Sequence, residues 1–404
     1  MNVHSRESSV PREWDRRGLP GWTYHSPALL ELEREALFRT HWQIVGHVSD
    51  LPEPGSFTTL DVVGERALVV RGQDGVIRAF HNICRHRGSR VVAEEKGMCR
   101  NALVCPFHGW VYNLDGSLRG AARPRSFPDL DKTEWGLMPI ELEIWMGLIF
   151  VRFRKGPQPP VAETMRPFAE EIGHYRIEDM IPAGDVWTQI SLVNWKSVRD
   201  VDNEGYHVAM AHPALQDLYG ATYYDEPFVN GASRSFATYN PHAGRRWSVR
   251  HYVRIAPEPV RLPEHLRKAW IYYGLFPNAV IAVTPEMCQF YQEFPLFTGE
   301  TMQRGAIYRY RDEDRRTAAA RYLARRIDRE TAAEDTQLTI WSNESMQSKA
   351  FGGFFLSDLE YGVRTHHDHL RAQLPIMRLE QAPAETEMAA INAALLVEKT
   401  VSDD

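Results

Sequence analysis

The sequence has little cysteine, no long hydrophobic run and no concentration of basic residues. Four cysteines in 404 residues are too few for a disulfide framework. No apolar stretch approaches the ~20 residues that a membrane-spanning helix needs, and the first twenty residues are charged and lack the apolar core of a signal peptide. The net charge is −6, from 47 basic and 53 acidic residues, without the clustered basic face that binds nucleic acid. We therefore expect a cytoplasmic protein that binds neither nucleic acid nor a membrane.

The first part of the chain divides into a helical segment and a run of short strands. Residues 25–45 carry apolar side chains at helical spacing after a Ser-Pro start, which predicts an amphipathic helix. From about Glu53 the pattern changes to short β-branched runs and Gly-rich turns, including a hairpin that turns at Asp74-Gly75. The sequence thus predicts an N-terminal helical segment, residues 1–44, that packs on a later catalytic domain, and a small all-β domain, residues 45–154.

The proline-rich segment KGPQPPV, residues 155–161, is the strongest signal for a domain boundary. Beyond it the pattern predicts a strand at 187–193, a helical segment at 195–212, strands that include WSVRHYVRI and AWIYYGLF within 247–310, a long charged helix from about Asp314 to Phe351, and a helix in the Ala/Glu-rich tail after Pro375. We therefore expect an α+β domain, residues 155–404, in which helices gather on one side of an antiparallel sheet.

Two close pairs of cysteine and histidine lie in the predicted β domain. Cys84-x-His86 and Cys105-x2-His108 each fall in a loop at the end of a hairpin, and together they offer four metal ligands. Such a set suits a structural zinc ion, or a two-iron, two-sulfide cluster with two thiolates on one iron and two imidazoles on the other. The alternation of Cys and His within each pair favours the cluster, because zinc fingers usually group their cysteines and their histidines separately.

A second candidate metal site lies in NWKSVRDVDNEGYHVAMAHP, residues 194–213. Glu204 and His207 would share a helix face, whereas His212 is rotated by about 140° from His207. The two histidines converge on one ion only if the helix ends or widens between them, and Pro213 disfavours helical geometry at His212. Two histidines and a carboxylate from elsewhere would form the facial triad of non-haem Fe(II).

The order of these motifs resembles the large (alpha) subunit of Rieske non-haem iron oxygenases. The resemblance is carried by Cys-Pro-Phe-His-Gly-Trp at 105–110, by Asn194-Trp195-Lys196 and by Glu204-Gly205-Tyr206-His207. It implies a Rieske domain followed by a helix-grip catalytic domain, in a homotrimer. It also implies that the two Cys/His pairs hold a [2Fe–2S] cluster and that His207 and His212 hold a mononuclear Fe(II). Glu204 would be the catalytic carboxylate that links this iron to the cluster of a neighbouring subunit.

The resemblance also implies a third iron ligand, an acidic residue on the long late helix. The family commonly reads Glu-Asp-x-x-Leu followed shortly by Glu-x-x-Gln. This chain reads Glu334-Asp335-Thr336-Gln337-Leu338 and later Glu344-Ser345-Met346-Gln347, with one extra helical turn between the two halves. The first half makes Asp335 the ligand, whereas the second half would put Thr339, a poor iron ligand, in its place. We expect Asp335, with Glu344 as the alternative.

Two features favour a methylated cation as the substrate. Glu204 stands where aromatic-ring dioxygenases typically carry aspartate, and Glu-Gly-Tyr-His resembles the branch that acts on carnitine, glycine betaine, choline and proline betaine. Aromatic residues on successive predicted strands could form a cage for such a cation, or could simply fill the core of the sheet. They are Trp270, Tyr272, Tyr273, Phe276, Phe290, Tyr291 and Phe294. A betaine would also need one cation in the pocket for its carboxylate.

The implied reaction is oxidative N-demethylation of a compound such as proline betaine, with dioxygen as co-substrate and release of formaldehyde. The sequence has no flavin or nicotinamide fingerprint, so electrons from NAD(P)H would arrive through a separate reductase that carries flavin and an iron–sulfur cluster. Aromatic-ring dihydroxylation and aryl-ether O-demethylation are alternatives with the same metal centres. An iron–sulfur electron carrier, or a binding protein with a structural metal, is an alternative of a different class, and it leaves His207 and His212 unexplained.

Overall fold

The computed structural model describes residues 10–156 and 158–402, and it divides into two compact units. The first, which we call the β unit, comprises Phe38–Glu163 and Arg176–Pro182. The second, which we call the α+β unit, comprises the described residues of Met1–Leu37, Thr164–Tyr175 and Ala183–Asp404. The β unit therefore continues past the predicted boundary at residues 154 and 155 and takes up a second, later segment.

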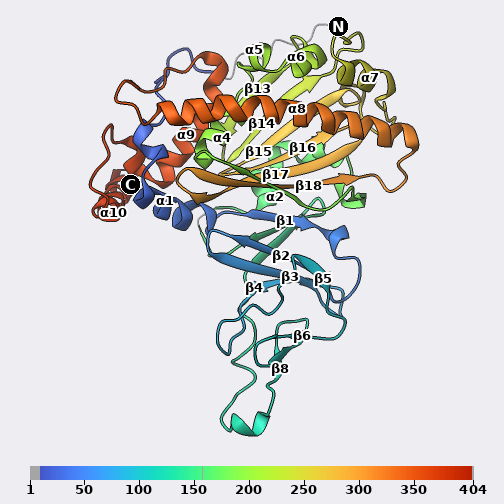
Figure 1. The fold of residues 1–404 in the computed structure, drawn as a ribbon, viewed down its shortest axis with the longest axis vertical. Coiled ribbons are helices and arrows are strands. Elements are labelled where there is room, and N and C mark those ends of the chain that lie inside the picture. The colour runs from blue at the N-terminus through green and yellow to red at the C-terminus, as the bar shows by residue number, and fades with distance from the viewer. Residues whose placement is uncertain (1–9, 157, 403–404) are drawn as a thin grey trace. The chain divides into compact units, whose positions relative to one another are not determined.

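The β unit contains three small antiparallel sheets (Figure 1). Their strand orders are β4 (Ile77–His81), β3 (Glu65–Arg71), β2 (Ser56–Val62), β5 (Lys96–Met98); β6 (Leu103–Val104), β7 (Val111–Tyr112), β8 (Leu118–Gly120); and β1 (Gln43–His47), β10 (Leu148–Arg152), β9 (Glu141–Trp145). The unit also includes β11 (Ile181–Pro182). The predicted hairpin is confirmed, because β3 pairs with β4, with Leu68 opposite Phe80. Cys84 and Cys105 belong to the packed core of this unit, which anchors both predicted ligand loops.

The α+β unit is built on one antiparallel sheet. Its strands follow the order β13 (Tyr224–Val229), β14 (Ala232–Thr238), β15 (Ala269–Leu275), β16 (Ala279–Thr284), β17 (Met287–Phe297), β18 (Glu300–Arg309), and β12 (Trp187–Ser191) pairs along β18. The central strand β16 is buried at every position. This matches an apolar sequence, AVIAVT, without the alternation that a half-exposed strand shows.

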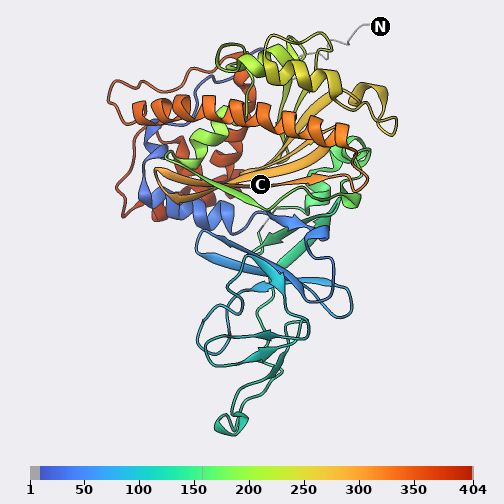
Figure 2. The same cartoon turned by 45° about the vertical axis from the view of Figure 1, so that its right-hand side comes forward.

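The long helix α8 crosses one face of this sheet (Figures 1 and 2). The helices are α1 (Pro27–Glu33), α2 (Val161–Thr164), α3 (Ala169–Gly173), α4 (Trp195–Asp202), α5 (Val208–Ala211), α6 (Pro213–Tyr219), α7 (Trp247–Ile255), α8 (Arg315–Ser345), α9 (Tyr361–Gln373) and α10 (Met388–Ser402). Asp314 caps α8 by accepting a hydrogen bond from the Thr317 amide at 2.7 Å. The predicted long charged helix is thus confirmed, and its rigid length carries several side chains to one site.

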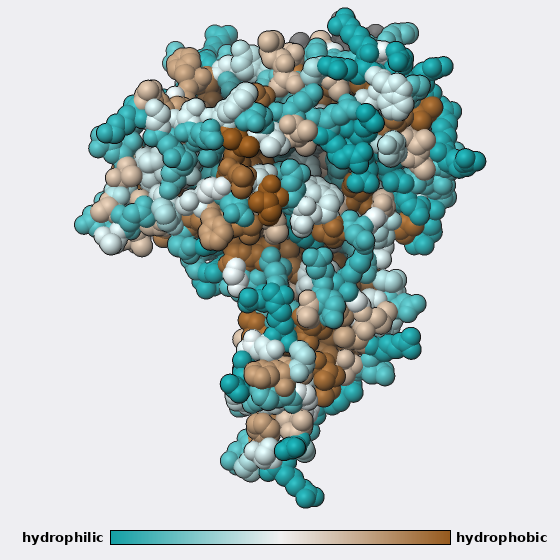
Figure 3. Space-filling view, viewed as in Figure 1, coloured by the Kyte–Doolittle hydropathy of each residue, from teal (hydrophilic) through white to brown (hydrophobic). Residues whose placement is uncertain are grey.

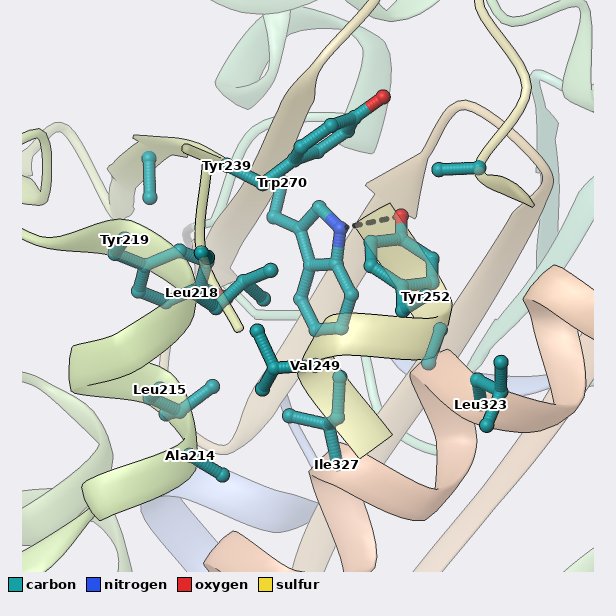
Figure 4. Packing of buried hydrophobic residues seen from close by; sticks show 14 of the residues in the cluster. Ala214, Leu215, Leu218, Tyr219, Tyr239, Val249, Tyr252, Trp270, Leu323 and Ile327 are labelled. Atoms are coloured by element: carbon teal, nitrogen blue, oxygen red, sulfur yellow. Dashed lines mark hydrogen bonds between the residues drawn. The ribbon is translucent and has the colours of Figure 1, made fainter. Parts of the chain in front are cut away.

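Aromatic and aliphatic side chains from the sheet and from helices α5, α6, α7 and α8 form a hydrophobic core in the α+β unit (Figure 4). Trp270 of β15 lies at its centre and donates a hydrogen bond to the Tyr252 hydroxyl of α7 at 2.8 Å. Leu218 of α6 and Ile327 of α8 pack in the same cluster and are fully buried. This core fixes α6 and α8 against the sheet, and both helices border the site described below.

Three predictions of secondary structure are wrong in part. WSVRHYVRI forms helix α7 instead of a strand, because its buried residues Ser248, Val249 and Tyr252 recur at helical spacing. The predicted helix at 25–45 ends at Phe38, after which Gln43–His47 forms β1. The predicted helical segment at 195–212 is also broken.

No helix in residues 10–156 and 158–402 is long and apolar enough to cross a membrane. In the face shown in Figure 3, hydrophobic side chains gather in a patch on the α+β unit, surrounded by hydrophilic ones.

Candidate metal centres

The two Cys/His loops of the β unit share one backbone design. In each loop the cysteine carbonyl accepts a hydrogen bond from the amide of a glycine four residues later, Gly88 at 2.9 Å and Gly109 at 3.0 Å. Both glycines adopt positive φ, 75° and 67°, a conformation that favours glycine. The unequal spacings Cys-x-His and Cys-x2-His therefore lie within turns of equal length.

The ligand atoms of these two loops suit a cluster whose two metal ions have different ligands. Cys84 and Cys105 are both 2% exposed, whereas the rings of His86 and His108 are partly exposed, with centroids 4.6 Å apart. Burial raises the pKa of the Cys84 thiol, and its sulfur lies 3.3 Å from the Tyr112 hydroxyl. Two buried sulfur ligands and two imidazoles near the surface fit a [2Fe–2S] cluster, which these four side chains would hold.

The segment around Glu204 in the α+β unit is a break between helices. Asn194 caps α4 through the Lys196 amide at 3.0 Å, and the side chains of Trp195 and Lys196 both donate to Glu33 of α1. Helix α4 then ends at Asp202, two residues before Glu204. The motif Asn194-Trp195-Lys196 therefore anchors α4, and the residues that follow are free to leave the helix.

Glycine is required in this break because of a close aromatic contact. A Cβ atom at Gly205 would lie 1.9 Å from the ring of Tyr223, and the Gly205 amide donates to Asp225 at 2.9 Å. A short helix, α5, then runs from Val208 to Ala211. His212, the residue before Pro213, caps its end in a non-helical conformation. The helix thus ends between the histidines, as Pro213 predicts.

His207, His212 and Asp335 converge on one point. The two Nε2 atoms lie 3.0 Å apart, and Oδ1 of Asp335 lies 2.9 Å from Nε2 of His212 and 3.6 Å from Nε2 of His207. The structure thereby brings together three residues that the sequence predicts as metal ligands, from two segments more than 120 residues apart.

The opposite ring nitrogens show that this group fits a metal ion. Nδ1 of His207 lies 2.5 Å from Glu204, and Nδ1 of His212 lies 2.9 Å from Oε2 of Glu334. A proton on each Nδ1 leaves each Nε2 with a lone pair, and Oδ1 of Asp335 accepts no hydrogen bond from the residues that the structure describes. Three facing lone pairs repel one another unless a cation lies between them, and imidazoles held by carboxylates are typical of metal sites.

Electrostatics at this site favour positive charge. Burial disfavours the charged form of His207, but the hydrogen bond that Nδ1 donates to Glu204 and the charges of Glu204 and Asp335 outweigh it and raise the pKa of His207. Burial likewise opposes protonation of His212, and Asp335 and Glu334 raise the pKa of this residue as well. The same negative charges would favour the binding of a divalent cation.

The alternative ligand lies elsewhere on α8. Glu344 is exposed near the end of the helix and is not part of the converging group, whereas Thr339 is buried one turn beyond Asp335. The hydroxyl of Thr339 donates to the Asp335 carbonyl at 2.8 Å. The extra turn in the sequence therefore extends α8 toward its C-terminal end and leaves Asp335 beside the histidines.

Glu204 uses both carboxylate oxygens locally. One faces Nδ1 of His207, and the other accepts from the Tyr206 amide and from the His207 amide at 3.2 Å. Two acidic residues of the preceding helix α4 have different partners. Asp200 forms hydrogen bonds with Tyr24 and His367, and Asp202 forms them with Arg199 and Tyr291. Of these three carboxylates only Glu204 touches the converging group.

A cavity of about 270 Å³ adjoins the converging group, and all three of its residues line the wall. Of the seven aromatic residues proposed as a cage, only Tyr272 and Tyr291 line it. Neighbours on a strand point to opposite faces, so Tyr273, next to Tyr272, instead donates to Glu171 at 2.5 Å.

Other aromatic lining residues were not predicted; they are Trp187, Tyr219, Tyr223 and Phe228. Tyr219 follows His212 by seven residues, a helical spacing that could have indicated a shared face.

Charged groups of the wall were also missed by sequence reasoning. Arg199 is 1% exposed and donates to Asp202 at 2.6 Å, and Glu293 lies 3.5 Å from the same guanidinium. Burial raises the pKa of Glu293 to about 7 and that of Asp328 to about 6. Single charged residues on a strand or helix usually indicate a solvated face, so local sequence does not indicate that these side chains face a cavity.

Comparisons with known proteins identify both domains. Residues 41–131 match the Rieske [2Fe-2S] domain, and residues 183–376 match the ring hydroxylating alpha subunit (catalytic domain). A solved structure of a quaternary ammonium Rieske monooxygenase, described for carnitine oxidation by gut microbiota, has a TM-score of 0.74 and 25% identity, covering 88% of this chain and 95% of that chain.

Curated relatives carry related names. The glycine betaine monooxygenase oxygenase subunit of Pseudomonas aeruginosa is 37% identical over 198 residues, 49% of this chain and 45% of that protein. The carnitine monooxygenase oxygenase subunit of Escherichia coli is 27% identical over 298 residues, 72% of this chain and 74% of that protein. The chain spans about half the length of the first curated relatives that it matches, which are glycine betaine and carnitine monooxygenase oxygenase subunits. With the Rieske domain and the catalytic domain present in this order, the chain belongs to the family of Rieske non-haem iron oxygenase alpha subunits.

Proposed function

We propose that the chain is the oxygenase component of a system that oxidatively N-demethylates a methylated ammonium compound. The observation that carries this proposal is the convergence of His207, His212 and Asp335 beside a cavity, in a chain that also carries two Cys/His loops. An electron carrier or a protein with one structural metal would need only the loops. The names of the relatives, which include glycine betaine, carnitine and choline monooxygenases, support an ammonium substrate.

The geometry supports the following assignment of ligands. Cys84, His86, Cys105 and His108 would hold a [2Fe–2S] cluster, and His207, His212 and Asp335 would hold the mononuclear iron. When bound, the cluster supplies single electrons and the iron supplies the activation of dioxygen.

The surrounding residues position these groups and control access to them. Glu204 and Glu334 each hold one imidazole through Nδ1, which fixes its orientation. Apolar side chains of the wall, including Val208, Leu215 and Ile340, limit water in the cavity. Glu204, which lies against His207, is also the proposed link to the cluster of a neighbouring subunit in a homotrimer.

The proposed reaction balances with dioxygen, two electrons and two protons. One oxygen atom enters an N-methyl group of the substrate, and the other leaves as water. The N-hydroxymethyl cation then releases formaldehyde and a proton, which leaves the amine with one methyl group fewer. Electrons from NAD(P)H would come through a separate reductase with flavin and an iron–sulfur cluster. Proline betaine is the substrate that the sequence resemblance suggests.

A substrate panel with matched variants tests this proposal. The holoenzyme with NADH and such a reductase is offered methylated amines, betaines and aromatic acids, and oxygen uptake and formaldehyde are measured. We expect formaldehyde from an ammonium compound in the wild type and in Glu344→Gln, and none in His207→Ala or Asp335→Ala. Oxygen uptake only with aromatic acids, or formaldehyde production that survives in His207→Ala, would contradict the proposal.

A further inference from the structure

The cavity beside the converging group carries a large excess of acidic side chains. Among the described residues that line it, seven have a carboxylate and one has a permanent positive charge. The carboxylates are Asp202, Glu204, Asp225, Glu226, Glu293, Asp328 and Asp335, and the cation is Arg199. A divalent metal ion would offset only part of this negative charge. The field in the cavity therefore favours a cation and opposes an anion.

The single guanidinium of the wall is already engaged. Arg199 donates to Asp202 at 2.6 Å and to Asn203 at 2.7 Å, and Glu293 lies at 3.5 Å. Its exposed fraction is 1%, and among the described residues its Nε is the one guanidinium nitrogen without a hydrogen-bond partner. A substrate carboxylate would thus compete with Asp202 and Glu293 for this one cation, which is costly in a buried site.

Asp328 is a further acidic residue of the cavity wall, on the helix that carries Asp335, and the charges of Arg325 and Arg329 act on it. The two residues are seven positions apart on α8, so they share a face and are separated by about 10 Å along the helix axis. Gln289 donates to Asp328 at 3.2 Å, and no described lysine or arginine forms an ion pair with it. Arg325 and Arg329 of the same helix do not line the cavity.

Aromatic and carboxylate groups of the cavity wall suit a methylated ammonium group. Tyr219 and Tyr272, whose hydroxyls lie 3.1 Å apart, line the same cavity. Glu293 is fully buried, and its carboxylate oxygens accept no hydrogen bond among the described residues. A cation between these groups would gain both charge pairing and contact with aromatic rings.

We infer that Asp328 is the counter-ion of the substrate's ammonium group and that the substrate carries no carboxylate of its own. This inference rests on the proposed function and narrows it to methylated ammonium alcohols and amines. It disfavours proline betaine, because the carboxylate of that compound would lie among acidic side chains. Asp328 thereby determines which substrate binds. Its distance from the metal ligands leaves room for an N-methyl group between Asp328 and those ligands.

Direct binding to the metal-loaded protein tests the inference without turnover. The probes are choline, its uncharged isostere 3,3-dimethylbutan-1-ol and glycine betaine, measured by isothermal titration calorimetry. We expect wild-type protein to bind choline about 30-fold or more tightly than either other probe, the effect of a desolvated charge pair. If the wild-type protein bound choline and the isostere equally, or bound glycine betaine more tightly, the inference would be overturned without any variant.

Variants then assign the effect to Asp328. Asp328→Asn should bind choline and the isostere equally, whereas Asp328→Glu should keep the preference for choline. The matched control is Glu330→Gln on the same helix, because Glu330 pairs with Arg326 at 2.9 Å and does not line the cavity. It removes the same charge and should bind all three probes as the wild type does. Unchanged preference in Asp328→Asn with normal iron content would overturn the role of Asp328.

Turnover separates this inference from the proposed function. Formaldehyde from betaines but not from choline-like compounds would leave N-demethylation intact and overturn the inference. Binding of choline that depends on Asp328, without formaldehyde from any ammonium compound, would support the counter-ion and overturn the proposed reaction.

Discussion

Removing the carboxylate that holds His212 should weaken iron binding without removing a ligand. Glu334 accepts a hydrogen bond from Nδ1 of His212 at 2.9 Å, and its side chain is 35% exposed. A hydrogen bond to a charged group contributes about 1.5–3 kcal/mol, and partial exposure places this one at about 1.5 kcal/mol. We therefore expect the affinity of Glu334→Ala for Fe(II) to fall about tenfold, the lower end of the effect of such outer residues.

The assay is an anaerobic Fe(II) titration of protein that retains its cluster, against a competing chelator. Glu334→Gln should lie between the wild type and Glu334→Ala, because its amide oxygen can still accept from Nδ1. Glu344→Ala, an exposed change on the same helix, should bind iron as the wild type does. Wild-type affinity in Glu334→Ala would refute the positioning role, and loss of iron in Glu344→Ala would refute Asp335 as the third ligand.

Three further predictions concern separate parts of the site. His207→Ala should lose the mononuclear iron while the visible absorption of the cluster remains, as metal analysis with absorption spectroscopy would show; loss of both would argue against independent sites. Glu204→Gln should retain all metal yet lose almost all coupled turnover, measured as formaldehyde formed per NADH oxidised, and wild-type coupling would mean that the link lies elsewhere. Burial raises the pKa of Asp328 from 3.8 to about 6, so its charged form destabilises the fold, and stability falls as pH rises through this window. By calorimetry, Asp328→Asn should therefore melt above the wild type at pH 7, by a margin that shrinks as pH falls from 6 toward 4; a constant margin would contradict the shift.

The parts of the site that local sequence could predict are those in which ligands lie close together along the chain. Each Cys/His pair occupies one turn closed by a glycine, so spacing alone indicates which atoms meet. The break before His212 was predictable from Pro213, because that rule acts on the adjacent residue. The close contact of Gly205 with the ring of Tyr223, in the break that follows α4, was not predictable, since it depends on tertiary packing.

The remaining parts depend on tertiary packing. Which of Asp335 and Glu344 faces the histidines depends on how α8 lies on the sheet, and the sequence offered matching motifs for both. Asp328 and Glu293 read as ordinary charged residues until the fold places them on the wall of a cavity. In α7, β-branched and aromatic residues suggested a strand, but packing against Trp270 and α8 selects the helical spacing of Val249 and Tyr252.

The central claim is that one chain carries two different iron centres, and metal analysis of the purified holoprotein tests it most directly. Iron, zinc and acid-labile sulfide are counted per chain, and the reduced protein is examined by electron paramagnetic resonance. The account predicts three irons and two sulfides per chain, with the rhombic signal of a histidine-ligated cluster. Two irons with no mononuclear site, or zinc in place of iron, would contradict it.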